Sequence, residues 1–116
     1  MAKKKFGKET YLKWYEEMLL WRKFEEKAGQ LYIQQKIRGF CHLYIGQEAV
    51  LAGSVEATEQ GDKFITAYRD HVHPIALGVP AKEIMAELYG KKTGIVKGKG
   101  GSMHMFSKEK NFFGGH

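Results

Sequence analysis

The glycine-rich segment after Gly90 limits what this chain can fold into. Residues 91–116 hold six of the fourteen glycines and show neither the period of a helix nor the alternation of a strand. A stretch of this length without secondary structure is uncommon inside a compact domain, where it is usually functional or disordered. We therefore expect a mostly helical part that ends near Gly90, then one long loop whose end is mobile because it lacks a sheet on which to pack.

The residues before Gly90 alternate between helical patterns and turn signals. Apolar side chains recur at spacings of three and four over residues 10–36, which predicts an amphipathic helix with Thr10 as its N-cap. Further helices are expected over 46–57, 73–77 and 81–89, the first ended by Gly61-Asp62 and the last by Gly90. Residues 63–67 are expected to form a short buried strand. The apolar stripe of the first helix consists of Trp14, Met18, Trp21, Phe24 or Glu25, Ala28, Leu31 and Tyr32.

Composition and charge exclude several classes of protein. The single cysteine, Cys41, allows no internal disulfide, which is typical of a reducing compartment. No apolar run approaches the ~20 residues that span a bilayer, and the first residues lack the apolar stretch of a secretory signal. We therefore expect a cytoplasmic protein that does not enter a membrane. The net charge is +6. We interpret the lysine-rich residues 1–9 as a solvated basic tail, with an anionic partner as the alternative.

Residues 94–104 combine glycines with lysines. Glycines allow backbone N–H groups to converge on an anion, and Lys97 and Lys99 add positive charge. The spacing is one residue short of a P-loop, and Gly100 stands where that motif needs Ser or Thr. The spacing also differs from the dinucleotide-binding fingerprint. The residues alone leave two interpretations open, a phosphate-binding loop or a flexible surface loop.

Two further positions have side chains suited to an anionic ligand. Tyr68 and Arg69 directly follow the expected strand, and ligands of α/β folds bind at the carboxyl ends of strands. A guanidinium offers several donors to phosphate or carboxylate, although an ion pair with Asp70 or Asp62 is the alternative. His42 can donate to an anion or move a proton, or it can be a partly buried structural histidine.

The sequence offers no recognisable metal centre or activated nucleophile. His71, His73 and Cys41 do not have the spacing of zinc ligands, and no Asp/Asn cluster resembles a magnesium or calcium loop. Cys41 and His42 are neighbours in sequence, so their side chains point apart. No serine motif for acyl transfer is present. We therefore predict no metal ligand within this chain.

Four segments, taken together and in order, resemble one protein family. They are similar to the alpha subunits of the first component of pyruvate dehydrogenase, within the thiamine diphosphate-dependent 2-oxo acid dehydrogenases. The resemblance runs from about residue 11 to residue 116, and four motifs at matching spacing make it specific. The segments are 37–49 (IRGFCHLYIGQEA), 62–71 (DKFITAYRDH), 97–105 (KGKGGSMHM) and 111–115 (NFFGG).

The resemblance implies a fold and a role for each matching residue. The implied fold is α/β and binds thiamine diphosphate, and residues 10–116 are its incomplete, mostly helical amino-terminal part. Tyr68 and Arg69 match positions that hold the cofactor's diphosphate. His42 matches a catalytic histidine at the active-site channel, near the diphosphate and the substrate. Residues 97–104 match a loop near the cofactor and the subunit contacts.

The resemblance also implies a reaction and partners. The reaction is oxidative decarboxylation of pyruvate, with the acetyl group passed to a lipoyl group on dihydrolipoyl acetyltransferase. The enzyme is a heterotetramer of two alpha and two beta subunits. The magnesium ligands and the pyrimidine contacts are expected beyond residue 116, and His116 stands where relatives often have Asn. We therefore expect that the chain alone neither binds the cofactor tightly nor catalyses.

Other functions remain as alternatives. Branched-chain 2-oxo acid dehydrogenases usually carry Tyr-Arg-Glu at the arginine motif, and acetoin dehydrogenases tend to carry His-Arg-Gly-His. Residues 68–71 (YRDH) and 40–42 (FCH) favour pyruvate. A small basic nucleic-acid-binding module is an alternative of another class, but the aromatic residues lie on the apolar stripe rather than among the basic residues, so no nucleic acid is expected. The third alternative is a subunit-interaction domain that docks through Trp14 and Trp21.

Overall fold

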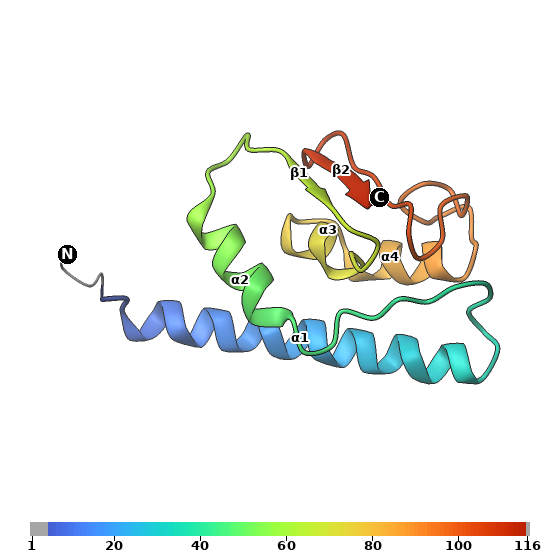
Figure 1. Cartoon of the computed structure of the whole chain (residues 1–116), viewed down its shortest axis with the longest axis horizontal. Coiled ribbons are helices and arrows are strands. Elements are labelled where there is room, and N and C mark those ends of the chain that lie inside the picture. The colour runs from blue at the N-terminus through green and yellow to red at the C-terminus, as the bar shows by residue number, and fades with distance from the viewer. Residues whose placement is uncertain (1–4, 116) are drawn as a thin grey trace.

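The computed structural model describes residues 5–115, which form helices and a small two-stranded sheet. Helix α1 runs the length of the molecule along one side, the strands lie on the opposite side, and α3 and α4 lie between them (Figure 1). This mixed content confirms the coarse prediction of helices with a short strand. The elements are α1 (Lys8–Ile33), α2 (Glu48–Ala57), β1 (Phe64–Thr66), α3 (Val72–Ala76), α4 (Ala81–Leu88) and β2 (Phe112–Gly115).

Helix α1 differs from its prediction at both ends. Its N-cap is the extended Gly7, which makes no side-chain cap, so the prediction of Thr10 as the cap is wrong. The helix starts inside the range assigned to the basic tail, of which residues 1–4 lie outside the described part of the chain. It ends at Ile33 rather than at residue 36, because Gln35 takes a left-handed conformation with φ 61°. Glycine is the usual residue at such a stop, so the sequence carried no signal for it.

The apolar stripe of α1 forms one wall of the core. Trp21, Phe24 and Ala28 are buried as predicted, whereas Tyr32 at the end of the stripe is 43% exposed. The opposite walls come from segments spread over the whole chain, which is why the helix needs the later elements to bury its face. Other buried core residues are Ile37, Tyr44, Leu51, Ala52, Val72, Val79, Ile84, Leu88, Met105 and Phe112.

The three shorter helices follow their predictions closely, except at one end. Helix α2 ends at Ala57 as predicted but begins at Glu48 rather than at residue 46. Its stop comes from the extended Thr58, whose hydroxyl donates to the Val55 carbonyl at 2.9 Å, and not from Gly61-Asp62. Helices α3 and α4 lie where they were expected. Gly90 ends the last helix with φ 70°, as predicted.

Strand β2 is the element that the sequence pattern did not predict. It pairs in parallel with β1, with Phe64 opposite Phe112 and Thr66 opposite Gly115. A Cβ on Gly115 would lie 2.6 Å from the Ala67 carbonyl oxygen, so glycine is needed where the chain passes this close. The glycine-rich end therefore has a strand beside it, and the expectation that it lacks a sheet is wrong. Strand β1 is half-buried rather than buried.

Candidate functional site

The structure brings His42, Tyr68 and Arg69 together beyond the carboxyl end of β1. The rings of His42 and Tyr68 meet edge to face with 4.6 Å between their centroids. The guanidinium carbon of Arg69 lies 5.6 Å from the centroid of the Tyr68 ring, and its Nη1 donates to the Leu43 carbonyl at 2.8 Å. The three residues that the sequence selected thus form one surface cluster, although His42 precedes Tyr68 and Arg69 by 26 and 27 positions.

The donors of this cluster remain available to an anion. Tyr68 is 43% exposed and Arg69 is exposed, and Arg69 forms no ion pair with any residue in 5–115. The alternative in which Arg69 pairs with a neighbouring aspartate is therefore wrong. Asp70 is buried and approaches Thr66, while Asp62 accepts the Glu59 N–H at 2.9 Å. A guanidinium, a phenol and an imidazole without a carboxylate partner fit the negative charge of a diphosphate.

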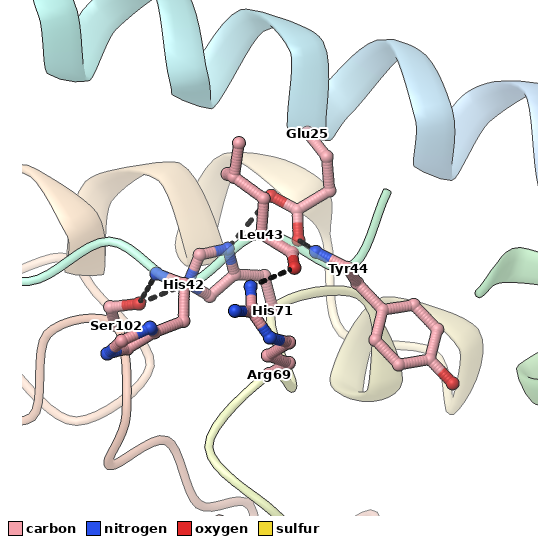
Figure 2. A network of polar contacts seen from close by, with 7 residues as sticks. All are labelled: Glu25, His42, Leu43, Tyr44, Arg69, His71 and Ser102. Atoms are coloured by element: carbon pink, nitrogen blue, oxygen red, sulfur yellow. Dashed lines mark hydrogen bonds and ion pairs between the residues drawn. The ribbon is translucent and has the colours of Figure 1, made fainter. Parts of the chain in front are cut away.

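A buried polar network lies directly beneath this cluster. Figure 2 shows His71 between the Glu25 carboxylate and the Ser102 hydroxyl, at 2.9 Å from Nδ1 and 2.6 Å from Nε2. The backbone N–H of His42 donates to Ser102 Oγ at 2.9 Å. Glu25, His71 and Ser102 are at most 5% exposed. Sequence reasoning did not select any of the three, although a glutamate on the apolar stripe of α1 was a visible sign.

Three titratable groups near the site have pKa values displaced toward their neutral forms. Burial raises the pKa of Asp70 to about 8, and burial together with His71 lowers the pKa of His73 to about 4. Burial, helped by the Glu25 charge, raises the pKa of the Cys41 thiol to about 11. A thiol held neutral in this way is a poor nucleophile, which agrees with the absence of a Cys41-His42 nucleophile pair.

The glycine-rich loop wraps around an anion that belongs to the chain itself. Glu87 of α4 is fully buried, and its two carboxylate oxygens accept four backbone N–H groups. Oε1 accepts from Val96 and Gly98 at 2.8 and 2.9 Å, and Oε2 accepts from Gly100 and Gly101 at 2.9 and 3.1 Å. The backbone N–H groups of the loop do converge on an anion, as its glycines allow, but the anion is a side chain of this chain and not a phosphate. These four amides are occupied, so the loop is not a phosphate cradle, and it is not a loose surface loop either.

Neither a metal cluster nor a membrane-spanning helix is found in the described residues. Within 5–115, no three His, Cys, Asp or Glu side chains lie close enough together to hold a metal ion. No helix in that range is both long and apolar enough to cross a bilayer.

Comparison with known proteins places the chain in a family. The alpha subunit of the pyruvate dehydrogenase E1 component from Rhizobium meliloti is 64% identical over 111 residues, which are 96% of this chain and 32% of the relative. The corresponding subunit of Rickettsia conorii is 53% identical over 116 residues, 100% of this chain and 36% of the relative. The chloroplastic alpha-3 subunit of Arabidopsis thaliana is 51% identical over 108 residues, 93% of this chain and 25% of the relative.

The chain thus spans about a third or less of the length of these curated relatives. Its residues 16–116 match the family model described as the dehydrogenase E1 component. This match covers most of the chain and includes the whole surface cluster and the network beneath it. The chain therefore belongs to the dehydrogenase E1 component family.

Proposed function

We propose that this chain supplies the diphosphate-binding part of a pyruvate dehydrogenase alpha subunit. The observation that carries the proposal is the cluster of His42, Tyr68 and Arg69, three donors at the end of β1 that form no ion pair with a carboxylate in residues 5–115. The names of the relatives support pyruvate as the substrate. The expected complete fold is the α/β thiamine diphosphate-binding fold, to which residues 10–116 contribute the helical part and the first paired strands.

Each donor has a distinct part in this proposal. Arg69 donates one N–H to the Leu43 carbonyl, and its other N–H groups can bind phosphate oxygens. The Tyr68 hydroxyl adds a neutral donor beside it. His42 lies against the Tyr68 ring, where an imidazole can bind a phosphate or substrate oxygen and transfer a proton. The chain's own contribution is therefore to bind and orient the diphosphate and to present His42 beside it.

The remaining parts of the activity lie with other groups. Bound thiamine diphosphate supplies the electron sink for loss of carbon dioxide from a 2-oxo acid. Magnesium would be held by residues outside this chain. A beta subunit would complete a heterotetramer of two alpha and two beta subunits in the cytoplasm, and the lipoyl group of dihydrolipoyl acetyltransferase would accept the acetyl group.

Inorganic diphosphate is expected to bind the surface cluster weakly and to lose affinity when Arg69 is removed. In a nuclear magnetic resonance titration, it should shift the resonances of His42, Tyr68 and Arg69. Arg69→Ala should weaken binding at least about tenfold, since a charge-assisted hydrogen bond contributes roughly 1.5–3 kcal/mol. Arg38→Ala removes the same charge from an exposed position outside the cluster and should leave the affinity unchanged. Equal affinities for the two variants would count against the proposed site.

Pyruvate is expected to be the preferred substrate of the enzyme assembled with its beta subunit. The assay measures thiamine diphosphate-dependent turnover of pyruvate, branched-chain 2-oxo acids and acetoin. We expect kcat/KM to be at least about tenfold higher for pyruvate, because the extra methyl groups of a branched substrate each change binding by roughly 1–3 kcal/mol in a fitted pocket. A preference for acetoin or a branched-chain acid would reassign the substrate but keep the cofactor site.

A further inference from the structure

The backbone of residues 42–44 is held at three consecutive residues by three different parts of the fold. The His42 N–H donates to Ser102 Oγ in the glycine-rich loop at 2.9 Å. The Leu43 carbonyl accepts from Arg69 Nη1 at 2.8 Å. The Tyr44 N–H donates to Glu25 Oε1 of α1 at 3.1 Å. A short irregular segment with three such anchors has little freedom to shift, although it belongs to no helix or strand.

His71 joins two of these anchors to each other. Its Nδ1 lies 2.9 Å from Glu25 Oε2, and its Nε2 lies 2.6 Å from Ser102 Oγ. It also follows Arg69, the third anchor, by two positions in the chain. The anchors therefore form one connected unit, which Figure 2 shows from α1 at the top to Arg69 below.

One arrangement of hydrogens satisfies every partner in this network. A carboxylate only accepts, so the His71 Nδ1–H donates to Glu25. Neutral His71 then accepts at Nε2 from the Ser102 hydroxyl, and Ser102 Oγ accepts the N–H of His42. A protonated His71 would donate to Ser102 instead. The Ser102 hydroxyl hydrogen would then have no acceptor among the described residues, which is costly at a buried site.

The order acid, histidine, serine also occurs in nucleophilic triads, but this serine is not placed for that chemistry. Ser102 is 5% exposed, so a substrate carbonyl cannot reach it. Its oxygen already accepts the backbone N–H of His42 and lies 2.6 Å from His71 Nε2, so both of its recorded contacts are buried within the network. What Ser102 does reach is the backbone of the proposed site residue His42.

We propose that Ser102 is a positioning residue, which sets the place of His42 through the hydrogen-bonded series Glu25–His71–Ser102–His42. This inference rests on the proposed function for its consequence, because His42 is there one of the anion-binding donors. Ser102 belongs to the glycine-rich loop, which Glu87 fixes by accepting four of its backbone N–H groups. A shift of this loop would therefore move His42 through the hydrogen bond to the Ser102 hydroxyl.

Nuclear magnetic resonance of Ser102→Ala and Ser102→Thr in the full chain tests this inference. In the wild type, the ring nitrogens of His71 should show the neutral form with hydrogen on Nδ1. The alanine variant should shift the His71 Nε2 resonance, speed exchange of the His42 amide hydrogen and weaken inorganic diphosphate binding about fivefold, since small displacements of a binding group are costly. The threonine variant keeps the hydroxyl and should stay close to the wild type.

Ser107→Ala is the matched control, because Ser107 lies in the same loop and its hydroxyl, among the described residues, accepts only the Lys110 N–H, at 3.3 Å. It should change neither the histidine resonances nor the affinity. The inference is overturned if Ser102→Ala leaves the His42 amide and the diphosphate affinity as in the wild type. If the wild type itself does not bind diphosphate, the proposed function fails. The His71 and His42 resonances would still decide whether Ser102 positions His42.

Discussion

Replacing Glu87 by glutamine is expected to lower the free energy of unfolding by about 3 kcal/mol, although the two side chains have nearly the same shape. The carboxylate accepts two N–H groups on each oxygen. The glutamine oxygen can serve one pair, but its NH₂ group then faces the other pair, donor against donor. Each N–H left without an acceptor at a buried site costs roughly 1–3 kcal/mol, and two are left. The loop should also loosen around Ser102.

Guanidinium chloride unfolding, followed by the fluorescence of the buried Trp21, measures this loss. Glu83→Gln is the matched control, since Glu83 lies one turn earlier on α4 and its side chain makes no hydrogen bond or ion pair with a described residue. The control should change stability by less than about 0.5 kcal/mol. A Glu87→Gln variant as stable as the control would mean that the loop does not depend on the carboxylate.

The glycine-rich loop shows how far local sequence reasoning reaches. The glycines showed that backbone N–H groups could converge on an anion, but they left a phosphate-binding loop and a flexible surface loop open, and the structure shows neither. The identity of the anion depended on which element packs against the loop, and Glu87 looked like an ordinary helix residue in the sequence. The same limit applies to β2, whose sequence FFGG has no alternation. That strand exists because β1 lies beside it and because Gly115 allows the close approach.

The candidate site likewise contains residues that local sequence patterns reveal and residues that they do not. Tyr68 and Arg69 were recognisable because they directly follow a strand, and His42 because the motif around it resembles a known family. The network beneath joins residues that are 31, 46 and 60 positions apart, so no local pattern reveals it. A charged residue on an apolar helix stripe was its one local sign. Glu25 stands there because the buried His71 and the Tyr44 N–H need an acceptor.

Asp70 should make the chain less stable as the pH rises toward 8, and Asp70→Asn should remove this dependence. The carboxyl is fully buried, Oδ1 has no hydrogen-bond partner among the described residues, and Oδ2 lies 3.4 Å from Thr66 Oγ1. Protonated Asp70 donates to Thr66, whose own hydrogen goes to the Gly114 carbonyl at 3.2 Å. Ionisation replaces this series with a buried charge, which is why burial raises the pKa from 3.8 to about 8.

The sign of the effect follows from the raised pKa. Well below pH 3.8, Asp70 is protonated in both the folded and the unfolded chain, and its stabilising contribution is fully present. As the pH rises, the unfolded chain ionises first, so this stability is lost until the folded pKa of about 8 is passed. Each pH unit between the two pKa values lowers the free energy of unfolding by about 1.4 kcal/mol. Allowing for relaxation around the charge, we expect a total loss on the order of 3 kcal/mol.

Denaturant unfolding of wild type and Asp70→Asn between pH 4 and pH 9 measures this contribution. The asparagine NH₂ can donate to Thr66 as the protonated acid does, so the two proteins should be nearly equal at pH 4. The variant should be more stable by on the order of 3 kcal/mol at pH 9. His73, whose lowered pKa of about 4 costs stability as the pH falls, is common to both proteins and cancels in the difference.

Asp62→Asn removes an exposed carboxylate and should show no such rise. A stability difference between wild type and Asp70→Asn that stays constant across this range would show that ionisation of Asp70 does not destabilise the fold. It would contradict the proposed hydrogen bonds from protonated Asp70 to Thr66 and from Thr66 to the Gly114 carbonyl.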